Sequence, residues 1–250
     1  MSHLKCEMSV WGAHPVEEAL NSSAVQLREL ILAENAQEKY AAVISKAKGK
    51  NVRIRTIRKE LLSKEIQNEK HQNIAAKISL TLWESLSDWF EIRERSDPLL
   101  AVAVDGIQDP QNVGTLMRSA HFFGAEVFLM TRDRNSPLTG VVAKASSGAL
   151  FSLPIVYAVN LARELEKCEE LDIWRVGLEA KAEKNLEALQ LQDRHLLLVV
   201  GSEGEGLRDL TRKRSDFLAK LPGSGRRESL NAAVAGSIAL YEISRHRYKI

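Results

Sequence analysis

From residue 99 onward, short apolar runs alternate with stretches that have the apolar spacing of helices. The runs lie at Leu99–Val104, Glu126–Met130, Leu153–Ala158, Ile173–Leu178, His195–Val200 and Phe217–Leu221. Short, mostly apolar runs are typical of strands that are buried on both faces. The alternation therefore predicts an α/β fold with a mostly parallel sheet and helices on both faces. Such sheets bind ligands beyond the carboxyl ends of their strands.

The first part of the chain has its own, more polar alternation. A strand, a turn at Gly12 and a helix are predicted over residues 9–20. Further strands are predicted over Leu27–Ala33, Asn51–Ile57 and His71–Leu82, and helices over Gln37–Lys48 and Leu61–Glu69. The periodicity then fades, so we predict a small α/β domain of residues 1–82, a linker of residues 83–97 and a larger domain of residues 98–250.

Composition narrows the class of protein. The chain of 250 residues is 44% hydrophobic and 27% charged, as in ordinary globular proteins. Its net charge of +2 means that any surface for nucleic acid must be local. Cys6 and Cys168 are isolated, which favours a reducing cytoplasm over a disulfide scaffold. We expect neither a signal peptide nor a membrane span, because the chain has no long uncharged apolar segment.

One segment of the small domain is strongly basic. Lys46–Lys59 contains seven basic residues and no acidic residue. The alternation within Asn51–Ile57 turns Arg53 and Arg55 to the outer side of a half-buried strand. Two interpretations stay open, namely a solvated face and a surface that contacts the backbone of a nucleic acid.

A glycine-rich turn, Gly201–Gly206, follows the apolar run at His195–Val200. Such turns often bind phosphate through their backbone N–H groups. Here Glu203 and Glu205 would repel a phosphate, and the glycine order is not that of a dinucleotide or P-loop motif. A neutral or cationic ligand suits the turn better, and the sulfonium of S-adenosylmethionine has this property. A tight turn with solvated glutamates is the alternative that the residue types leave open.

Two further polar loops are expected at the same edge of the sheet. Asp105–Gly124 follows the first strand of the larger domain, and Asn112 and Arg118 belong to the helix predicted there. Pro222–Ser229 follows the last predicted strand and leads into a long helix, which Ser229 or a neighbour caps. Each of these side chains has an ordinary structural explanation when it is taken singly. Together, three loops at the carboxyl ends of strands predict a ligand crevice.

Three motifs give the larger domain a specific resemblance. DPQNVGTLMRSAHFFGA, LLLVVGSEGEGL and LPGSGRRESLNAAVAG occur in this order within roughly the last 150 residues. They resemble the three motifs of the SpoU/TrmH branch of the SPOUT methyltransferases. The N-terminal GAHPVEEAL and EKHQNIAAK resemble the small substrate-binding domain of the bacterial 23S rRNA guanosine 2′-O-methyltransferases (RlmB type).

The resemblance implies a fold, a cofactor and a set of site residues. It implies a C-terminal trefoil knot, S-adenosylmethionine held in the knot, and an obligate homodimer in which both protomers line the site. The cofactor pocket that it implies is formed by Val200, Gly201, Ser202, Leu221, Leu230 and Ala233. The catalytic residues that it implies are Asn112, Arg118, Glu203, Ser229 and Asn231, with Arg118 activating the ribose hydroxyl.

The sequence departs from the family pattern at two places. Gly223 follows Pro222 where the family usually has an apolar residue, and Arg226 and Arg227 make this third loop more basic. We expect both arginines, together with Arg53 and Arg55, to contact RNA. His71-Gln72-Asn73 replaces the usual HQG of the N-terminal module. The histidines and cysteines lack the spacing of metal ligands, so no metal site is expected.

Three functions are considered. Ribose 2′-O-methylation of a guanosine in 23S rRNA is favoured, with S-adenosylmethionine as the methyl donor. A tRNA ribose 2′-O-methyltransferase of the same family is the close alternative, although such enzymes usually carry a different and often shorter N-terminal extension. A catalytically silent RNA-binding factor of ribosome assembly is the third. The intact Asn112, Arg118, Glu203 and Asn231 argue against this last class.

Overall fold

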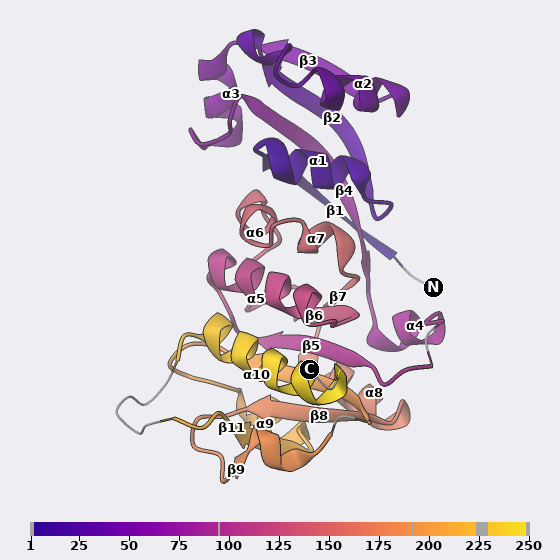
Figure 1. Cartoon of the computed structure of the whole chain (residues 1–250), viewed down its shortest axis with the longest axis vertical. Helices are drawn as coiled ribbons and strands as arrows, with labels where there is room; N and C mark the ends of the chain where they lie inside the picture. The colour runs from indigo at the N-terminus through magenta and orange to yellow at the C-terminus, as the bar shows by residue number, and fades with distance from the viewer. Residues whose placement is uncertain (1–2, 95, 192, 224–229, 249–250) are drawn as a thin grey trace.

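One sheet runs through the whole molecule (Figure 1). The computed structural model describes residues 3–94, 96–191, 193–223 and 230–248. The strands are β1 (His3–Trp11), β2 (Val25–Ala33), β3 (Arg53–Ile57), β4 (Ile74–Trp83), β5 (Leu100–Asp105), β6 (Val127–Thr131), β7 (Ile155–Ala158), β8 (Ile173–Leu178), β9 (Lys184–Asn185), β10 (His195–Gly201) and β11 (Phe217–Lys220). Their order in the sheet is β3-β2-β4-β7-β6-β5-β10-β8-β11-β9, and β1 also pairs with β4.

Helices cover both faces of this sheet. They are α1 (Ala13–Asn21), α2 (Ala41–Gly49), α3 (Lys59–Ile66), α4 (Leu86–Glu91), α5 (Pro110–Phe122), α6 (Gly140–Ala145), α7 (Ala149–Ser152), α8 (Leu161–Glu170), α9 (Asp209–Arg214) and α10 (Ala232–Tyr248), with the short 3₁₀ helices η1 (Glu34–Ala36) and η2 (Leu186–Leu189). None of the helices described is long and apolar enough to cross a membrane.

The predicted parallel sheet is confirmed. From β7 to β9 along the sheet, every neighbouring pair is parallel. Both faces of β5 are buried: Leu100, Val102 and Val104 face the core under α5, while Ala101 and Ala103 face the core under α8. This two-sided burial explains why the sequence shows an unbroken apolar run there. The two-residue strand β9 was not predicted, because two polar residues carry no strand pattern.

The small domain is joined to the larger one by more than the chain. Trp83, the last residue of β4, pairs with Val156 of β7, so the sheet continues across the boundary. Ser22 Oγ donates a hydrogen bond to the carbonyl of Phe151 (2.5 Å). The α6 helix begins at Gly140, where a Cβ atom would lie 2.0 Å from a ring carbon of Trp11. The two domains therefore pack closely, and Gly140 allows this approach.

The segment predicted as a linker contains a helix. The faded periodicity of residues 83–97 indicated irregular structure, whereas α4 lies within it. Its first N–H group, that of Leu86, donates to the buried Glu164 Oε2 on α8 (2.8 Å), and Lys167 Nζ donates to Glu164 Oε1 (2.9 Å). A helix of six residues is too short to show a clear period, so its stability comes from this tertiary cap.

The HQN segment is a junction of the small domain. Gln72 and Asn73 have φ angles of 55° and 66°, in the left-handed region. Asparagine tolerates this region better than most residues, so it can stand where the family usually has glycine. The Gln72 carbonyl accepts from Tyr40 Oη (2.7 Å), and the Asn73 carbonyl accepts from the Ala33 N–H (3.0 Å). These bonds hold β2 and the segment before α2 against the start of β4.

The buried His71 makes the stability of this domain depend on pH. Its Nδ1 accepts from the Asn73 N–H (2.9 Å), and its Nε2 lies 2.9 Å from Ser63 Oγ. Burial, assisted by Lys59, lowers the pKa of His71 below its ordinary value. The neutral ring is thus favoured in the folded state, and protonation would remove the bond from Asn73.

We expect the free energy of unfolding to fall as the pH drops below about 6.5, the pKa of an unfolded histidine. The stabilisation by neutral His71 is fully present above that pH and is lost as the pH approaches the lower pKa of the folded state. Urea unfolding at pH 7.5 and 5.5 tests this. His71→Gln should lose less stability between the two pH values than the wild type. An equal loss in both proteins would remove His71 as a cause.

Candidate active site

The first site residue, Asn112, is positioned by the start of α5. Asp109 caps this helix, because its Oδ1 accepts from the Gln111 N–H (2.8 Å). The turn between β5 and α5 is held by Asn135, whose Oδ1 accepts from the N–H groups of Gly106 and Ile107 (both 2.9 Å). Asn112 therefore lies in the first helical turn, just beyond the carboxyl end of β5.

Glu203 lies on the turn that follows β10. Ser202 and Gly206 exchange backbone hydrogen bonds (3.1 Å each) and close this turn. A Cβ atom on Gly201 would lie 2.3 Å from the carbonyl carbon of Gly206, so only glycine permits the closure. Gly204 has a φ of 87° and turns the chain at the tip. The glycines thus build a tight turn that presents Glu203 at the surface.

Asn231 combines a structural and a site role. Its Oδ1 accepts from the N–H groups of Ala233 (3.0 Å) and Val234 (3.2 Å), so it is the residue that caps α10. Its Nδ2 donates to Asn112 Oδ1 (3.0 Å) and also to Glu203 Oε1. The sequence left the capping residue open between Ser229 and a neighbour, and Ser229 lies outside the described residues.

Side chains from three segments that are distant in sequence therefore meet: the start of α5, the turn after β10, and Asn231 directly before α10. Asn112 Nδ2 donates to Glu203 Oε1 (2.8 Å), which completes a group formed by Asn112, Glu203 and Asn231. We call this group the amide–carboxylate trio. Two amide donors fix one oxygen of Glu203, so the carboxylate has a defined orientation. Such a carboxylate can orient a guanidinium or a hydroxyl group of a ligand.

Arg118 does not join the trio within one chain. It lies six residues beyond Asn112, about 9 Å further along the helix axis, and points to another side of α5. Arg118 is exposed, and among the described residues it has no hydrogen-bond or ion-pair partner. Phe122, one turn further on, is 80% exposed. The expectation that a single chain brings this guanidinium to the acidic turn is therefore not met, and Arg118 lies on the exposed side of α5 with Thr115 and Phe122.

Most of the expected cofactor residues adjoin the trio in sequence: Val200, Gly201 and Ser202 precede Glu203, and Leu230 and Ala233 flank Asn231, whereas Leu221 directly follows β11. Val200, Gly201 and Ala233 are buried, whereas Ser202 and Leu221 are half-buried. Leu230, directly before Asn231, is 51% exposed. An exposed apolar side chain beside the Glu203 carboxylate fits a ligand that has an aromatic base and a positive charge, as S-adenosylmethionine has. Arg226 and Arg227 lie outside the described residues, so their expected RNA contacts stay predictions.

The two arginines of β3 have different surroundings. Arg55 Nη2 pairs with Glu65 Oε1 (2.7 Å) and Glu29 Oε2 (3.2 Å), and the hydrogen bond with Glu65 raises the pKa of Arg55. Arg53 pairs only loosely with Glu29 (3.4 Å), and 77% of its side chain is exposed. The charge of Arg55 is thus balanced within the domain, while Arg53 projects into solvent.

The sequence motifs did not identify two residues that support the site, Asn135 and Asp105. Asn135, which holds the turn before α5, lies in an irregular segment without a pattern. Asp105 ends β5 and is completely buried, with its carboxylate bonded to Arg208. A charged residue at the end of an apolar run was the available indication, because a buried carboxylate requires a partner.

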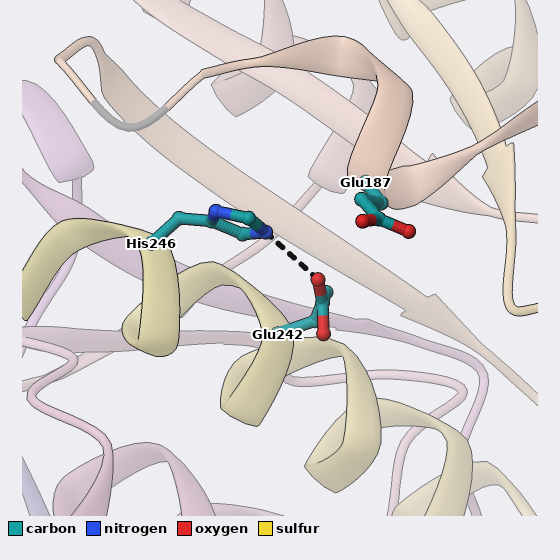
Figure 2. Close-up of side chains that lie close together, drawn as sticks. All are labelled: Glu187, Glu242 and His246. Atoms are coloured by element: carbon teal, nitrogen blue, oxygen red, sulfur yellow. Dashed lines mark hydrogen bonds and ion pairs between the residues drawn. The ribbon is translucent and has the colours of Figure 1, made fainter. Parts of the chain in front are cut away.

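One group of described side chains has the composition of a metal site. The ligand atoms of Glu187, Glu242 and His246 lie within 4.8 Å of one another, beside a pocket of about 360 Å³ (Figure 2). Glu242 Oε1 already accepts from Arg245 Nη2 (2.8 Å) and lies 2.8 Å from His246 Nε2. The bond from Arg245 lowers the pKa of Glu242. This group is an ion-pair cluster near the end of α10, remote from Asn231.

Asn231 gives a test of the trio through stability. Asn231→Ala removes the cap of α10 and two contacts of the trio, so we expect a loss of about 1–2 kcal/mol of unfolding free energy. Asn231→Ser is the matched control, because serine keeps the cap and loses the contacts. In urea unfolding it should recover the part of the loss that the cap contributes, and the remaining loss measures the contacts of Asn231 with Asn112 and Glu203. Equal losses in both variants would show that Asn231 does not cap the helix.

Known proteins share both parts of this architecture. The model of the SpoU rRNA Methylase family matches residues 99–241, and a model for RNA 2′-O ribose methyltransferase substrate binding matches residues 9–81. Proteins named 23S rRNA (guanosine-2′-O-)-methyltransferase RlmB are 34% identical in Coxiella burnetii (99% of this chain, 98% of the relative) and 37% identical in Pseudomonas aeruginosa (95% and 96%). The SpoU methyltransferase AviRb from Streptomyces viridochromogenes, solved in complex with AdoMet, has the same fold (TM-score 0.82, 22% identity, 98% of this chain and 92% of that chain). The chain belongs to the SpoU rRNA methylase family.

Proposed function

We propose that this protein transfers a methyl group from S-adenosylmethionine to the ribose 2′-oxygen of a guanosine in 23S rRNA. The amide–carboxylate trio carries this proposal, because it joins the three motif loops at one edge of the sheet. The relatives from Coxiella burnetii and Pseudomonas aeruginosa that are named for this reaction match 99% and 95% of the chain, and thus include the small domain. The proposed ribosomal substrate and the two free cysteines of the chain favour a cytoplasmic location for this protein.

The reaction needs position and charge more than covalent chemistry. Bound S-adenosylmethionine supplies an electrophilic methyl group on its sulfonium. Holding the ribose hydroxyl in line with that group supplies up to roughly 7–11 kcal/mol in favourable cases. The hydroxyl releases its proton to solvent water as its oxygen attacks. The guanidinium of Arg118 offers hydrogen-bond donors and no acceptor, so it stabilises the developing alkoxide and does not act as a literal base.

Arg118 reaches a site through a homodimer in this proposal. The exposed residues Val234, Ile238 and Tyr241 of α10 recur with helical spacing and form one apolar face. Tyr241 touches Phe123 edge-on at a centroid distance of 6.1 Å, next to the exposed Phe122. Exposed apolar patches of this kind mark interfaces. A second copy seated here brings its Arg118 toward the trio of its partner, so that both protomers line each site.

The small domain is the proposed RNA-binding unit, with boundaries at residues 1–82 and a connection over residues 83–97. Arg53 is its best-exposed candidate for a phosphate contact, together with Arg226 and Arg227 of the third loop. Arg55 supports that strand through Glu29 and Glu65. We also propose that the C-terminal segment of the chain is threaded through a loop and forms the family's trefoil knot. The placement of the last two elements supports this, because β11 lies beyond β8 in the sheet while α10 packs on α5 (Figure 1).

Mass mapping of ribose methylation in ribosomal RNA tests the proposed reaction. Purified protein with S-adenosylmethionine should add one 2′-O-methylguanosine to unmodified 23S rRNA, and Arg118→Ala should lower the rate at least about 100-fold. Methylation of tRNA instead would select the tRNA enzyme of the same family. If calorimetry detects no binding of S-adenosylmethionine at millimolar concentration, both enzyme functions are excluded and the catalytically silent assembly factor is the remaining function.

Mixing two inactive variants tests the shared site. Arg118→Ala and Glu203→Ala each disable every site in their own homodimers. In a mixed dimer, one site combines an intact Arg118 with an intact Glu203 from the other chain. Statistical exchange should restore about a quarter of the wild-type rate. Activity that stays at the level of the single variants would place Arg118 and Glu203 of one chain in the same site.

A further inference from the structure

A buried ion pair lies directly behind the amide–carboxylate trio. Asp105 is 0% exposed, and burial of an unpaired carboxylate is strongly unfavourable. Its partner is Arg208: the Arg208 N–H donates to Oδ2 (2.9 Å), Nε donates to Oδ1 (2.5 Å), and Nη2 also contacts Oδ1. The carboxylate thus receives both a backbone and a side-chain donor from one residue, which fixes Arg208 in place and orientation.

The pair holds both ends of the turn that carries Glu203. Asp105 lies opposite Gly201 in the parallel ladder of β5 and β10, where the turn begins. Arg208 directly precedes α9, where the turn ends. A single residue on β5 therefore anchors residues 201–208 at their entry by backbone pairing and at their exit by its side chain. Between these anchors the backbone pairing of Ser202 with Gly206 closes the turn.

The carboxyl end of β5 also positions Asn112, one of the two hydrogen-bond partners of Glu203. Gly106 and Ile107 follow Asp105 and are fixed by Asn135, and α5 with Asn112 begins three residues later. The distance between Asn112 and Glu203 is thus set by two short paths that both start at Asp105. A displacement of Arg208 would move Glu203 while Asn112 stays in place.

We infer that Asp105 and Arg208 are positioning residues for methyl transfer: they keep the Glu203 carboxylate within hydrogen-bond distance of Asn112 and Asn231. Neither residue touches substrate or cofactor in this role. The inference rests on the proposed function for its rate readout, but its geometric content concerns only the trio. A misplacement of about 1 Å in an active site can cost a factor of about 100 in rate.

The test compares Arg208→Ala with Arg212→Ala, which removes a more exposed ion pair of the same segment, Arg212–Glu179 (2.9 Å), and leaves the Asp105–Arg208 pair intact. Arg208→Ala should lower kcat at least about 30-fold with a smaller change in KM, and Arg212→Ala should leave kcat within about twofold. Arg208→Lys, which keeps the positive charge, should recover part of the loss. If Arg208→Ala does not fold, Arg208→Lys is compared with Arg212→Ala in its place.

A double-mutant cycle separates positioning from mere stability. Glu203→Ala should lower the melting temperature of the wild type, yet leave that of Arg208→Ala unchanged, because the trio is already broken there. Additive effects of the two substitutions on the melting temperature, or equal kcat losses in the Arg208 and Arg212 variants, would overturn the inference. If the wild type does not methylate RNA, the proposed function is refuted. The positioning role of Asp105 and Arg208 is then still decided by the melting temperatures of the double-mutant cycle.

Discussion

The parallel pairing of β5 with β10 is the constraint on which the site depends. Parallel neighbours end at the same edge of a sheet, so the segments after Asp105 and Gly201 must emerge together although 96 positions separate these residues in the printed sequence. Each segment is then fixed by its own device: Asn135 holds the turn into α5, and the glycines close the turn that carries Glu203. The chemistry of the site therefore rests on rigid strand ends, as precise positioning requires.

The last helix completes the site from outside the sheet. A Cβ atom on Gly236 would lie 2.5 Å from Leu116 Cδ1, so glycine lets α10 approach α5 closely. Ser237 Oγ donates to Ser119 Oγ (2.7 Å) across the same crossing. This packing sets the start of α10, and hence Asn231, against Asn112. It also leaves Val234, Ile238 and Tyr241 outside, where a second chain is proposed to bind. One helix thus links site assembly to dimer formation.

Much of this architecture follows from the sequence, because two-sided burial leaves plain apolar runs such as Leu196–Val200. The meeting of Asn112, Glu203 and Asn231 also followed, since each lies just after a predicted strand or at a helix start. Other features depend on tertiary contacts without a local signal. The single pairing of Trp83 with Val156 is one, and the cap that Glu164 gives to α4 is another. The outward direction of Arg118 depends on helix phase relative to neighbours, which a motif does not encode.

The central claim is that three strand-end loops form one binding site for the methyl donor. Amide hydrogen exchange with and without S-adenosylmethionine tests it most directly, because it reports each segment separately. The account predicts that the cofactor slows exchange together in residues 105–112, 201–208 and 230–235, with little change in β1–β3. Protection confined to one of these segments, or located in the small domain instead, would contradict it.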